Sequence, residues 1–191
     1  MHGFAEITSR TVRKGTNLNH MKSLFVLVIL AAVSAQAALA PTTVKPGSIA
    51  KAVKQGFLAG GEAGREFSLI DTQVKKTSDS ESVALFYGDE KGQPLKGKPG
   101  FFQITLDRSG KRIVIDLAQM SRTAVDPDAL RKKLKDSKFV ASLDMTMDPV
   151  DFSTNITLNL KEPVELAVES SDGANPSRLA LTLKSAPGAK K

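Results

Sequence analysis

The stretch that decides the fold is residues 102–117, which read FQITLDRSGKRIVIDL. Apolar and polar residues alternate on both sides of Asp107-Arg108-Ser109-Gly110. Such alternation is typical of a strand with one buried and one solvated face, and a short connection that contains Gly is typical of a hairpin. The stretch therefore predicts two antiparallel strands joined by a turn.

The same alternation recurs before and after this hairpin. It predicts further strands near residues 67–76, 82–87, 138–147, 152–160, 163–169 and 177–183. Residues 89–100 are rich in Gly and Pro and predict a loop. Asp126-Pro127 predicts the start of a short helix over 126–136, with Leu130 and Leu134 on its buried side.

The order of the predicted elements repeats, with four strands on each side of the helix. Residues 110–117 and 176–183 correspond, because in each a turn residue precedes a polar residue, an Arg and an apolar run. We interpret the order as a duplicated four-strand unit, and the alternative is that unrelated hairpins share a common pattern. The predicted fold class is all-β, with two small, mostly antiparallel four-stranded units packed as a sandwich over 67–185 and one short helix between them.

The segments that flank this domain have weaker patterns. Residues 38–66 predict either a leader or a short helix over 45–58, with Ser48 as its N-cap. Residues 186–191 predict a disordered tail.

The N-terminus has the pattern of a secretory signal peptide. Lys22 precedes an apolar run over 24–33, and Ala35-Gln36-Ala37 provides a small-residue cleavage site. The run is shorter than the roughly 20 residues that a transmembrane helix needs. We predict that translation begins at Met21, that residues 1–37 are an extension plus a cleavable signal peptide, and that the mature protein is periplasmic. Membrane contact is expected only through the signal peptide before cleavage.

Composition excludes most catalytic chemistry from the mature chain. The full sequence has a net charge of +7, two His and no Cys. Removal of residues 1–37 takes away four basic residues, one acidic residue and both His, which lowers the charge to +4. Without His or Cys there is no Ser-His-Asp triad, thiolate nucleophile or His- or Cys-ligated metal site. We expect no enzyme activity, metal or cofactor, although carboxylates such as Asp144, Asp148 and Asp151 leave glycoside hydrolysis open by composition.

Nucleotide and nucleic-acid binding are not expected either. Residues 92–98 fit the spacing G-x-x-x-x-G-K, but Pro99 follows where a phosphate-binding loop needs Ser or Thr. Aromatic residues are too few for a base-stacking surface. Lys91, Lys96 and Lys98 make the 89–100 loop basic, which predicts either a solvated loop or a contact with carboxylates or phosphates of the cell envelope.

Three stretches resemble the AMIN domain, a bacterial envelope module found beside cell-wall amidases and pilus secretins. They are residues 68–74, which resemble its opening strand, residues 102–117, which resemble its central hairpin, and residues 156–183, which resemble its second half. Two features depart from the family pattern, since Asn155 stands where an Arg is common and the 89–100 loop is long. The resemblance implies two similar packed β-sheets, a periplasmic location and binding to peptidoglycan or an envelope partner.

We therefore expect an exported, non-catalytic cell-envelope module that binds peptidoglycan through a polar sheet face. The candidate ligand-binding residues are Arg112, Asp116, Arg178, Lys91, Lys96 and Lys98. The alternative is a protein–protein adaptor for a periplasmic secretin, pilus or division complex, which binds its partner by strand addition at an exposed sheet edge.

Overall fold

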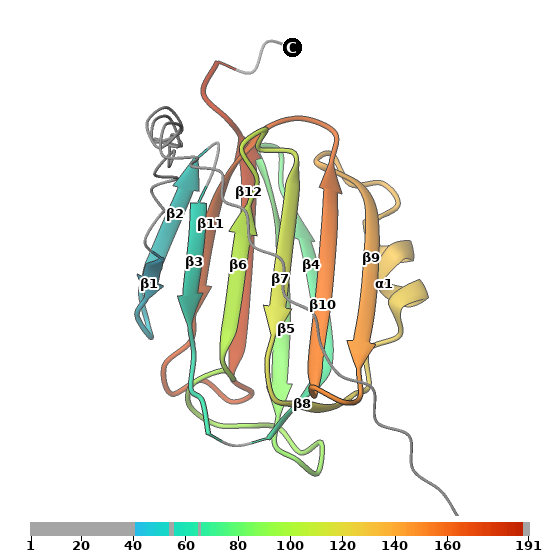
Figure 1. The fold of residues 1–191 in the computed structure, drawn as a ribbon. Coiled ribbons are helices and arrows are strands. Elements are labelled where there is room, and N and C mark those ends of the chain that lie inside the picture. The colour runs from blue at the N-terminus through green and yellow to red at the C-terminus, as the bar shows by residue number, and fades with distance from the viewer. Residues whose placement is uncertain (1–40, 54–55, 65, 189–191) are drawn as a thin grey trace, which may run out of the picture. The chain divides into compact units, whose positions relative to one another are not determined.

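The fold is a sandwich of two β-sheets with one helix (Figure 1), seen in a computed structural model that describes residues 41–53, 56–64 and 66–188. The described residues belong to one unit, Ala38–Lys191. The strands are β1 (Thr42–Val44), β2 (Ile49–Val53), β3 (Gly56–Gly60), β4 (Phe67–Lys76), β5 (Ser80–Gly88), β6 (Phe102–Leu106), β7 (Arg112–Leu117), β8 (Met120–Thr123), β9 (Val140–Asp148), β10 (Ser153–Leu160), β11 (Val164–Ser170) and β12 (Arg178–Ser185), and the helix is α1 (Pro127–Leu134). The predicted signal peptide over residues 1–37 lies outside the described residues.

The turn between β6 and β7 shows how local sequence specifies the hairpin. Gly110 has a φ of 70°, which glycine adopts without steric cost, and its amide donates to the carbonyl of Asp107 at 3.0 Å. Burial alone would raise the pKa of the Asp107 carboxyl, but hydrogen bonds from the Ser109 hydroxyl and from the amides of Lys111, Arg112 and Gly110 lower that pKa below 3.8. The predicted hairpin is confirmed.

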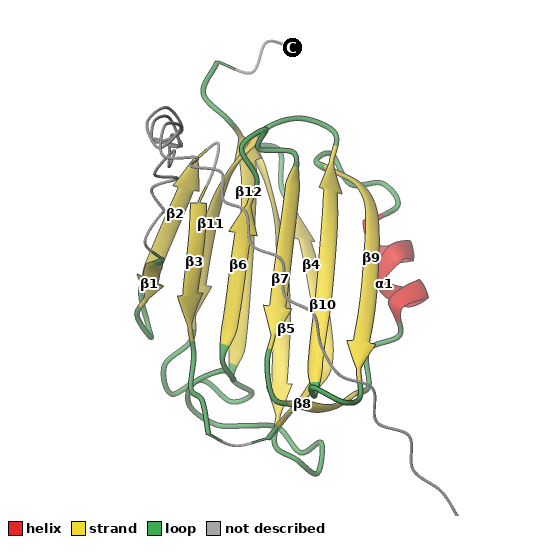
Figure 2. Cartoon of the chain, viewed as in Figure 1, coloured by secondary structure: helices red, strands yellow, loops and turns green. Residues whose placement is uncertain are grey.

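The two sheets have six strands each and are mixed. Sheet A has the order β1-β3-β6-β7-β10-β9, and sheet B has the order β2-β11-β12-β5-β4-β8. The pairs β1/β3 and β4/β8 are parallel, and the other neighbours are antiparallel. The all-β prediction with one short helix is confirmed (Figure 2), whereas four-stranded sheets were the wrong expectation because β1, β2, β3 and β8 extend both sheets.

The strand order agrees with a repeated unit. Exchanging β4–β7 with β9–β12 turns the sheet A order β6-β7-β10-β9 into the sheet B order β11-β12-β5-β4. Each half thus contributes one hairpin to each sheet, and the two halves interlock around a shared core. The predicted packing of one unit against the other is wrong in this respect, since neither half forms a sheet of its own.

The helix closes one side of the sandwich, between the edge of sheet A and sheet B. Asp126 caps it by accepting from the Asp128 amide, and Leu130 and Leu134 are buried. Arg131 Nε donates to the carbonyl of Leu143 in β9 at 3.0 Å, and Lys133 Nζ donates to the carbonyl of Thr72 in β4 at 2.6 Å. These two bonds fasten α1 to both sheets.

Residues 41–64 correct the prediction of a leader or helix. The chain instead forms β1, β2 and β3, where β2 pairs with β11 and β3 pairs with β6. Ser48 does not cap a helix, because its hydroxyl donates to the Lys45 carbonyl in a turn. Gly60 permits the close pairing of β1 with β3, since a Cβ there would lie 2.6 Å from the Val44 carbonyl oxygen. Pairing with distant strands outweighs the local helical pattern.

The start of the C-terminal tail is ordered, contrary to the prediction of a disordered tail from residue 186. Ala186 is buried, and its amide donates to the Pro163 carbonyl at 3.1 Å. Residues 189–191 lie outside the described part of the chain. Within that part, no helix is long and apolar enough to cross a membrane.

Tyr87 is the single tyrosine, and the hydroxyl of its fully buried ring has no hydrogen-bond partner among the described residues. An unpaired buried hydroxyl costs free energy on folding. We expect Tyr87→Phe to leave the free energy of unfolding unchanged or to raise it by up to about 1 kcal/mol. Chemical denaturation at pH 7 measures this effect, and a loss of more than about 1 kcal/mol would show that the hydroxyl stabilises the fold.

The same variant tests the titration of Tyr87. Burial raises the pKa of its hydroxyl well above the ordinary value of 10.0. The folded state therefore holds the Tyr87 proton more tightly than the unfolded state does. The contribution of this difference to the free energy of unfolding is fully present below about pH 10, and it is lost as the pH rises above that value. The wild type should lose stability relative to Tyr87→Phe above about pH 10, with tyrosinate absorbance appearing only on unfolding.

Candidate functional site

On the outer face of sheet B, outward-facing side chains of neighbouring strands lie opposite one another in cross-strand rows. The cross-strand rows are Asp71, Phe86 and Arg178; Gln73, Ala84, Ala180 and Glu169; and Lys75, Ser82 and Thr182. β4 and β12 are far apart in sequence, but both pair with β5. The sheet register therefore brings these residues onto one surface.

Two adjoining hollows cross this face. The first, of about 410 Å³, is lined by residues 71–74 of β4, Phe86 of β5 and Lys133 of α1. The second, of about 140 Å³, is lined by Gln73, Lys75, Ser82, Ala84, Phe86, Glu169, Arg178, Ala180 and Thr182. Gln73 and Phe86 line both hollows, so the two adjoin on β4 and β5 and together extend from α1 to β11; we call them the sheet B groove.

The shape of the sheet B groove follows from residue size. Ala84, Ala180 and Ser82 have short side chains and lie between larger neighbours in the cross-strand rows. Phe86 is half-buried and offers one apolar ring to the groove. The groove therefore combines a shallow floor, one aromatic surface and polar groups around its rim.

The charged groups at the groove are accessible. Arg178 Nη2 lies 3.1 Å from Glu169 Oε1, and the two side chains are 45% and 40% exposed. Lys133 Nζ lies 3.9 Å from the Asp71 carboxylate and also binds a backbone carbonyl. Exposed pairs of this kind contribute little to stability, about 0–1 kcal/mol, so a ligand can replace them at small cost.

The structure separates the predicted ligand-binding residues. Arg178 lies in the sheet B groove. The loop of Lys91, Lys96 and Lys98 runs beside the start of β12, because Ser177 donates to the Leu95 carbonyl and Gly97 donates to the Ala174 carbonyl.

Arg112 and Asp116 lie on the outer face of sheet A, on the opposite side of the sandwich. The Asp116 carboxylate accepts a hydrogen bond from the side-chain amide of Asn155, its cross-strand neighbour on β10. No ion pair joins Arg112 to Asp116 within the described residues, because residues four apart on a strand are separated by about 13 Å. Arg112 and Asp116 thus share a face of the strand without contacting each other.

Sequence reasoning missed most of the groove. Phe86, Gln73, Lys75 and Glu169 lie in predicted strands, but the sequence does not indicate which of those strands pair. Only the pairing of β5 with both β4 and β12 brings them together. The usable signal was the small side chains at 82, 84 and 180, which are unusual for outward positions of strands.

Of the acidic residues considered for hydrolysis, Asp148 has a structural role. Asp148 Oδ1 accepts from the amides of Val150 and Asp151 at 2.8 and 3.2 Å, which shapes the turn between β9 and β10. In the described ranges, no group of three or more His, Cys, Asp or Glu side chains is arranged to hold a metal ion.

Comparison with known proteins identifies no relative of this chain. No protein-family model, curated protein or solved structure matches the chain.

Proposed function

We propose that the chain is an exported, non-catalytic module of the bacterial cell envelope that binds peptidoglycan in the sheet B groove. The observation that carries the proposal is that two hollows share Gln73 and Phe86 and together extend across β4, β5, β12 and β11. The secretory pattern before Ala38 and the resemblance to the AMIN domain support an envelope location.

The groove has the length and chemistry that a wall polymer requires. Four neighbouring strands span about 14 Å, which matches about four residues of an extended stem peptide or a short run of sugars. Phe86 offers its ring to the apolar face of a sugar, while Gln73 and Thr182 offer hydrogen-bonding groups to its hydroxyls. Arg178 and Lys75 offer cations to the carboxylates of the stem peptides.

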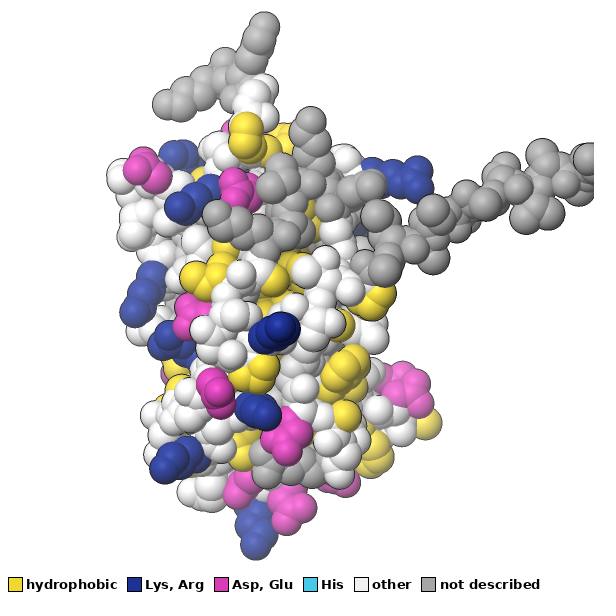
Figure 3. All heavy atoms as spheres, turned by 90° about the vertical axis from the view of Figure 1, so that its left-hand side faces the viewer, with side chains coloured by type: hydrophobic (Ala, Val, Ile, Leu, Met, Phe, Trp, Pro, Cys, Tyr) yellow, Lys and Arg dark blue, Asp and Glu magenta, His cyan; other side chains and the backbone are white. Residues whose placement is uncertain are grey.

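Charge alone does not support a polyanion such as nucleic acid as the ligand. Figure 3 shows the side of the molecule that carries β1 and β2, where cationic and anionic side chains are interspersed. At the groove, too, Glu169 and Asp71 lie beside the cations. A ligand that carries hydroxyls as well as carboxylates fits this mixture better than a uniform row of phosphates.

Replacing Arg178 with alanine tests the proposed face. The variant loses one charge-assisted hydrogen bond to a wall carboxylate, so its affinity for purified sacculi should fall about tenfold. Co-sedimentation with sacculi at low salt measures the affinity. The exposed fractions given above indicate that the fold should tolerate the change.

Arg112→Ala is the matched control. Arg112 is also exposed, begins the strand at the corresponding place in sheet A, and loses the same charge when replaced. Its binding should equal that of the wild type. Equal losses in both variants would show that the groove is not the binding face, and full recovery of the wild type in the unbound fraction would overturn wall binding altogether.

A further inference from the structure

β9 is the longest edge strand among the described residues. It ends sheet A and has nine residues, against three in β1, four in β8 and five in β2. An edge strand presents unpaired N–H and C=O groups, and proteins usually cover or charge such an edge.

The backbone groups that face away from the sheet can be identified from one hydrogen bond. Arg131 Nε of α1 donates to the carbonyl of Leu143, so this carbonyl points away from β10. The N–H and C=O groups of one residue point to the same edge of a strand, and those of the next residue point to the opposite edge. The N–H and C=O groups of Met145 and Met147 therefore point to the free edge, as those of Leu143 do. In the part of the chain that the structure describes, nothing bonds these four groups.

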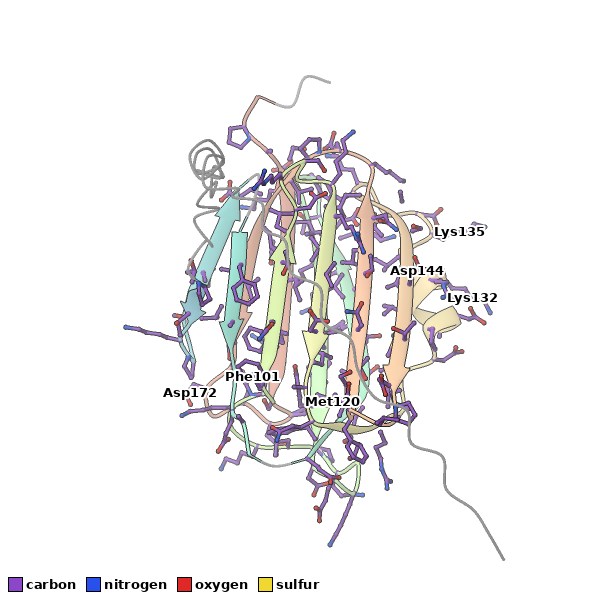
Figure 4. The ribbon with its side chains drawn as sticks, in the orientation of Figure 1. Phe101, Met120, Lys132, Lys135, Asp144 and Asp172 are labelled. Carbon is purple, nitrogen blue, oxygen red and sulfur yellow. The ribbon has the colours of Figure 1, made fainter. Side chains whose placement is uncertain are left out.

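The helix covers only the first half of β9. The hollow between α1 and β9, of about 350 Å³, is lined on the strand by residues 140–144 and on the helix by Arg131, Leu134 and Lys135. Figures 1 and 4 show α1 beside β9, with Lys132, Lys135 and Asp144 labelled in Figure 4. Residues 145–148 continue beyond this hollow, and we call them the open half of β9.

The two faces of the open half differ in chemistry. Asp148 in the open half and Asp144 just before it lie on the outer side with Thr146 between them, and neither carboxylate makes an ion pair with another described residue. On the other side, Met145 packs against the core and Met147 is 45% exposed. The adjoining turn adds Val150 and Phe152, which are 81% and 46% exposed.

We propose that the open half of β9 binds an extended segment of a partner protein as an added strand, in which basic residues alternate with aliphatic ones. An added strand places every second side chain on the same face as Asp144 and Asp148, where a cation pairs with each carboxylate. Its intervening side chains lie on the same face as Met147, whose exposed side chain fits an aliphatic group. The outward amides and carbonyls of Met145 and Met147 supply the hydrogen bonds.

A second copy of the chain fits this edge less well. Antiparallel pairing of two copies of β9 about Thr146 places Asp144 of one copy opposite Asp148 of the other. Like charges directly opposite each other on paired strands are unfavourable. The acidic row therefore favours a basic partner over self-association, and the inference does not depend on wall binding in the sheet B groove.

The probe is an acetylated and amidated peptide of about seven residues in which lysine alternates with valine, compared with its glutamate–valine counterpart. Titration followed by backbone amide NMR should show saturable shifts confined to residues 143–152. The lysine peptide should bind at least tenfold more tightly than the glutamate peptide. Equal affinities, no saturable binding, or shifts centred on β4, β5 and β12 would overturn the proposal.

Met147→Pro tests the hydrogen bonds of the edge, with Met147→Val as its matched control. Proline removes an N–H that points away from β10, so the ladder of sheet A keeps its bonds. The proline variant should bind the lysine peptide at least tenfold more weakly than the valine variant, while thermal unfolding confirms that both fold. Equal binding by the two variants would show that no strand is added.

Asp144→Lys keeps the proposal testable if the proline variant does not fold. It should weaken binding of the lysine peptide at least fivefold and strengthen binding of the glutamate peptide, and unchanged affinities for both would contradict the charge argument.

Sedimentation of the wild type without peptide tests whether a second copy of the chain occupies this edge instead. A dimer that Met147→Pro abolishes would show that a second copy occupies the edge, which would overturn the assignment to a basic partner.

Discussion

Replacement of Glu81 by alanine is expected to lower the free energy of unfolding by about 3 kcal/mol. Glu81 is a buried carboxylate on the inward side of β5, and it accepts hydrogen bonds from the Ser137 hydroxyl and the Lys138 amide. Ser137 Oγ in turn accepts from the amides of Phe139 and Val140 at 3.1 and 2.7 Å. Removal of the carboxylate leaves two donors without their acceptor in a region that water does not readily reach.

The effect should extend beyond one residue, because this network joins the chain after α1 to the hairpin of β4 and β5. Lys161 Nζ also donates to the Ser137 carbonyl at 2.6 Å, and Lys138 Nζ donates to the Ser78 carbonyl at 3.1 Å. Glu81 therefore holds together segments from both halves of the chain.

Chemical denaturation of three variants measures this contribution. Glu81→Gln keeps one acceptor oxygen and should lose about half as much stability as Glu81→Ala. Glu90→Ala removes an exposed carboxylate from the 89–100 loop and should change the free energy of unfolding by less than about 0.5 kcal/mol. A Glu81→Ala variant as stable as Glu90→Ala would show that the buried network contributes nothing.

Alanine at Ile115 or at Leu181 is expected to lower the free energy of unfolding by about 3–4 kcal/mol in either case. Both side chains are fully buried in the core, where Ile115 pairs with Ile156 and Leu181 pairs with Val83. The exchange of strands that interconverts the two sheets places these residues at corresponding positions. Each substitution removes similar buried apolar volume from the centre of a sheet.

The two losses should agree within about 1 kcal/mol, since both sites lie on the central antiparallel pair of a sheet. Val114→Ala is the matched control, because Val114 is next to Ile115 but faces outward, and the corresponding residue of sheet B is Ala180. It should cost less than about 1 kcal/mol. A large loss at Ile115 with a small loss at Leu181 would show that the two sheets do not contribute equally to the core.

Eight of the strands were predictable because their side chains alternate locally. In β7, Ile113, Ile115 and Leu117 are buried while Val114 and Asp116 face outward, as the period-two pattern indicates. The same regularity made the repeat visible, and the order of strands in the two sheets agrees with it.

Strands with weak local patterns were not predictable. The predicted helix over residues 45–58 is replaced by β2, which ends sheet B, and by β3, which lies between β1 and β6 in sheet A. β8 has four residues and pairs with the distant β4. Short edge strands gain most of their stability from their neighbours, so their own residues carry little signal.

The candidate site was predictable in part. Arg178 was a candidate because it begins an apolar run, and it lies in the sheet B groove. Arg112 has the same local sequence pattern but lies on the other sheet. The distinction depends on neighbours such as Phe86 and Gln73, which reach Arg178 only through strand pairing.

The sequence by itself determined which residues of the long strands are buried and where the helix begins. Those properties depend on spacing along the chain and on residue type. Only the tertiary structure decided that each half divides between the two sheets, that the residues of the sheet B groove lie together, and that no described residue covers the second half of β9. These features depend on contacts between residues far apart in sequence, and alternation with a period of two specifies which side of a strand is buried but not which strand lies beside it.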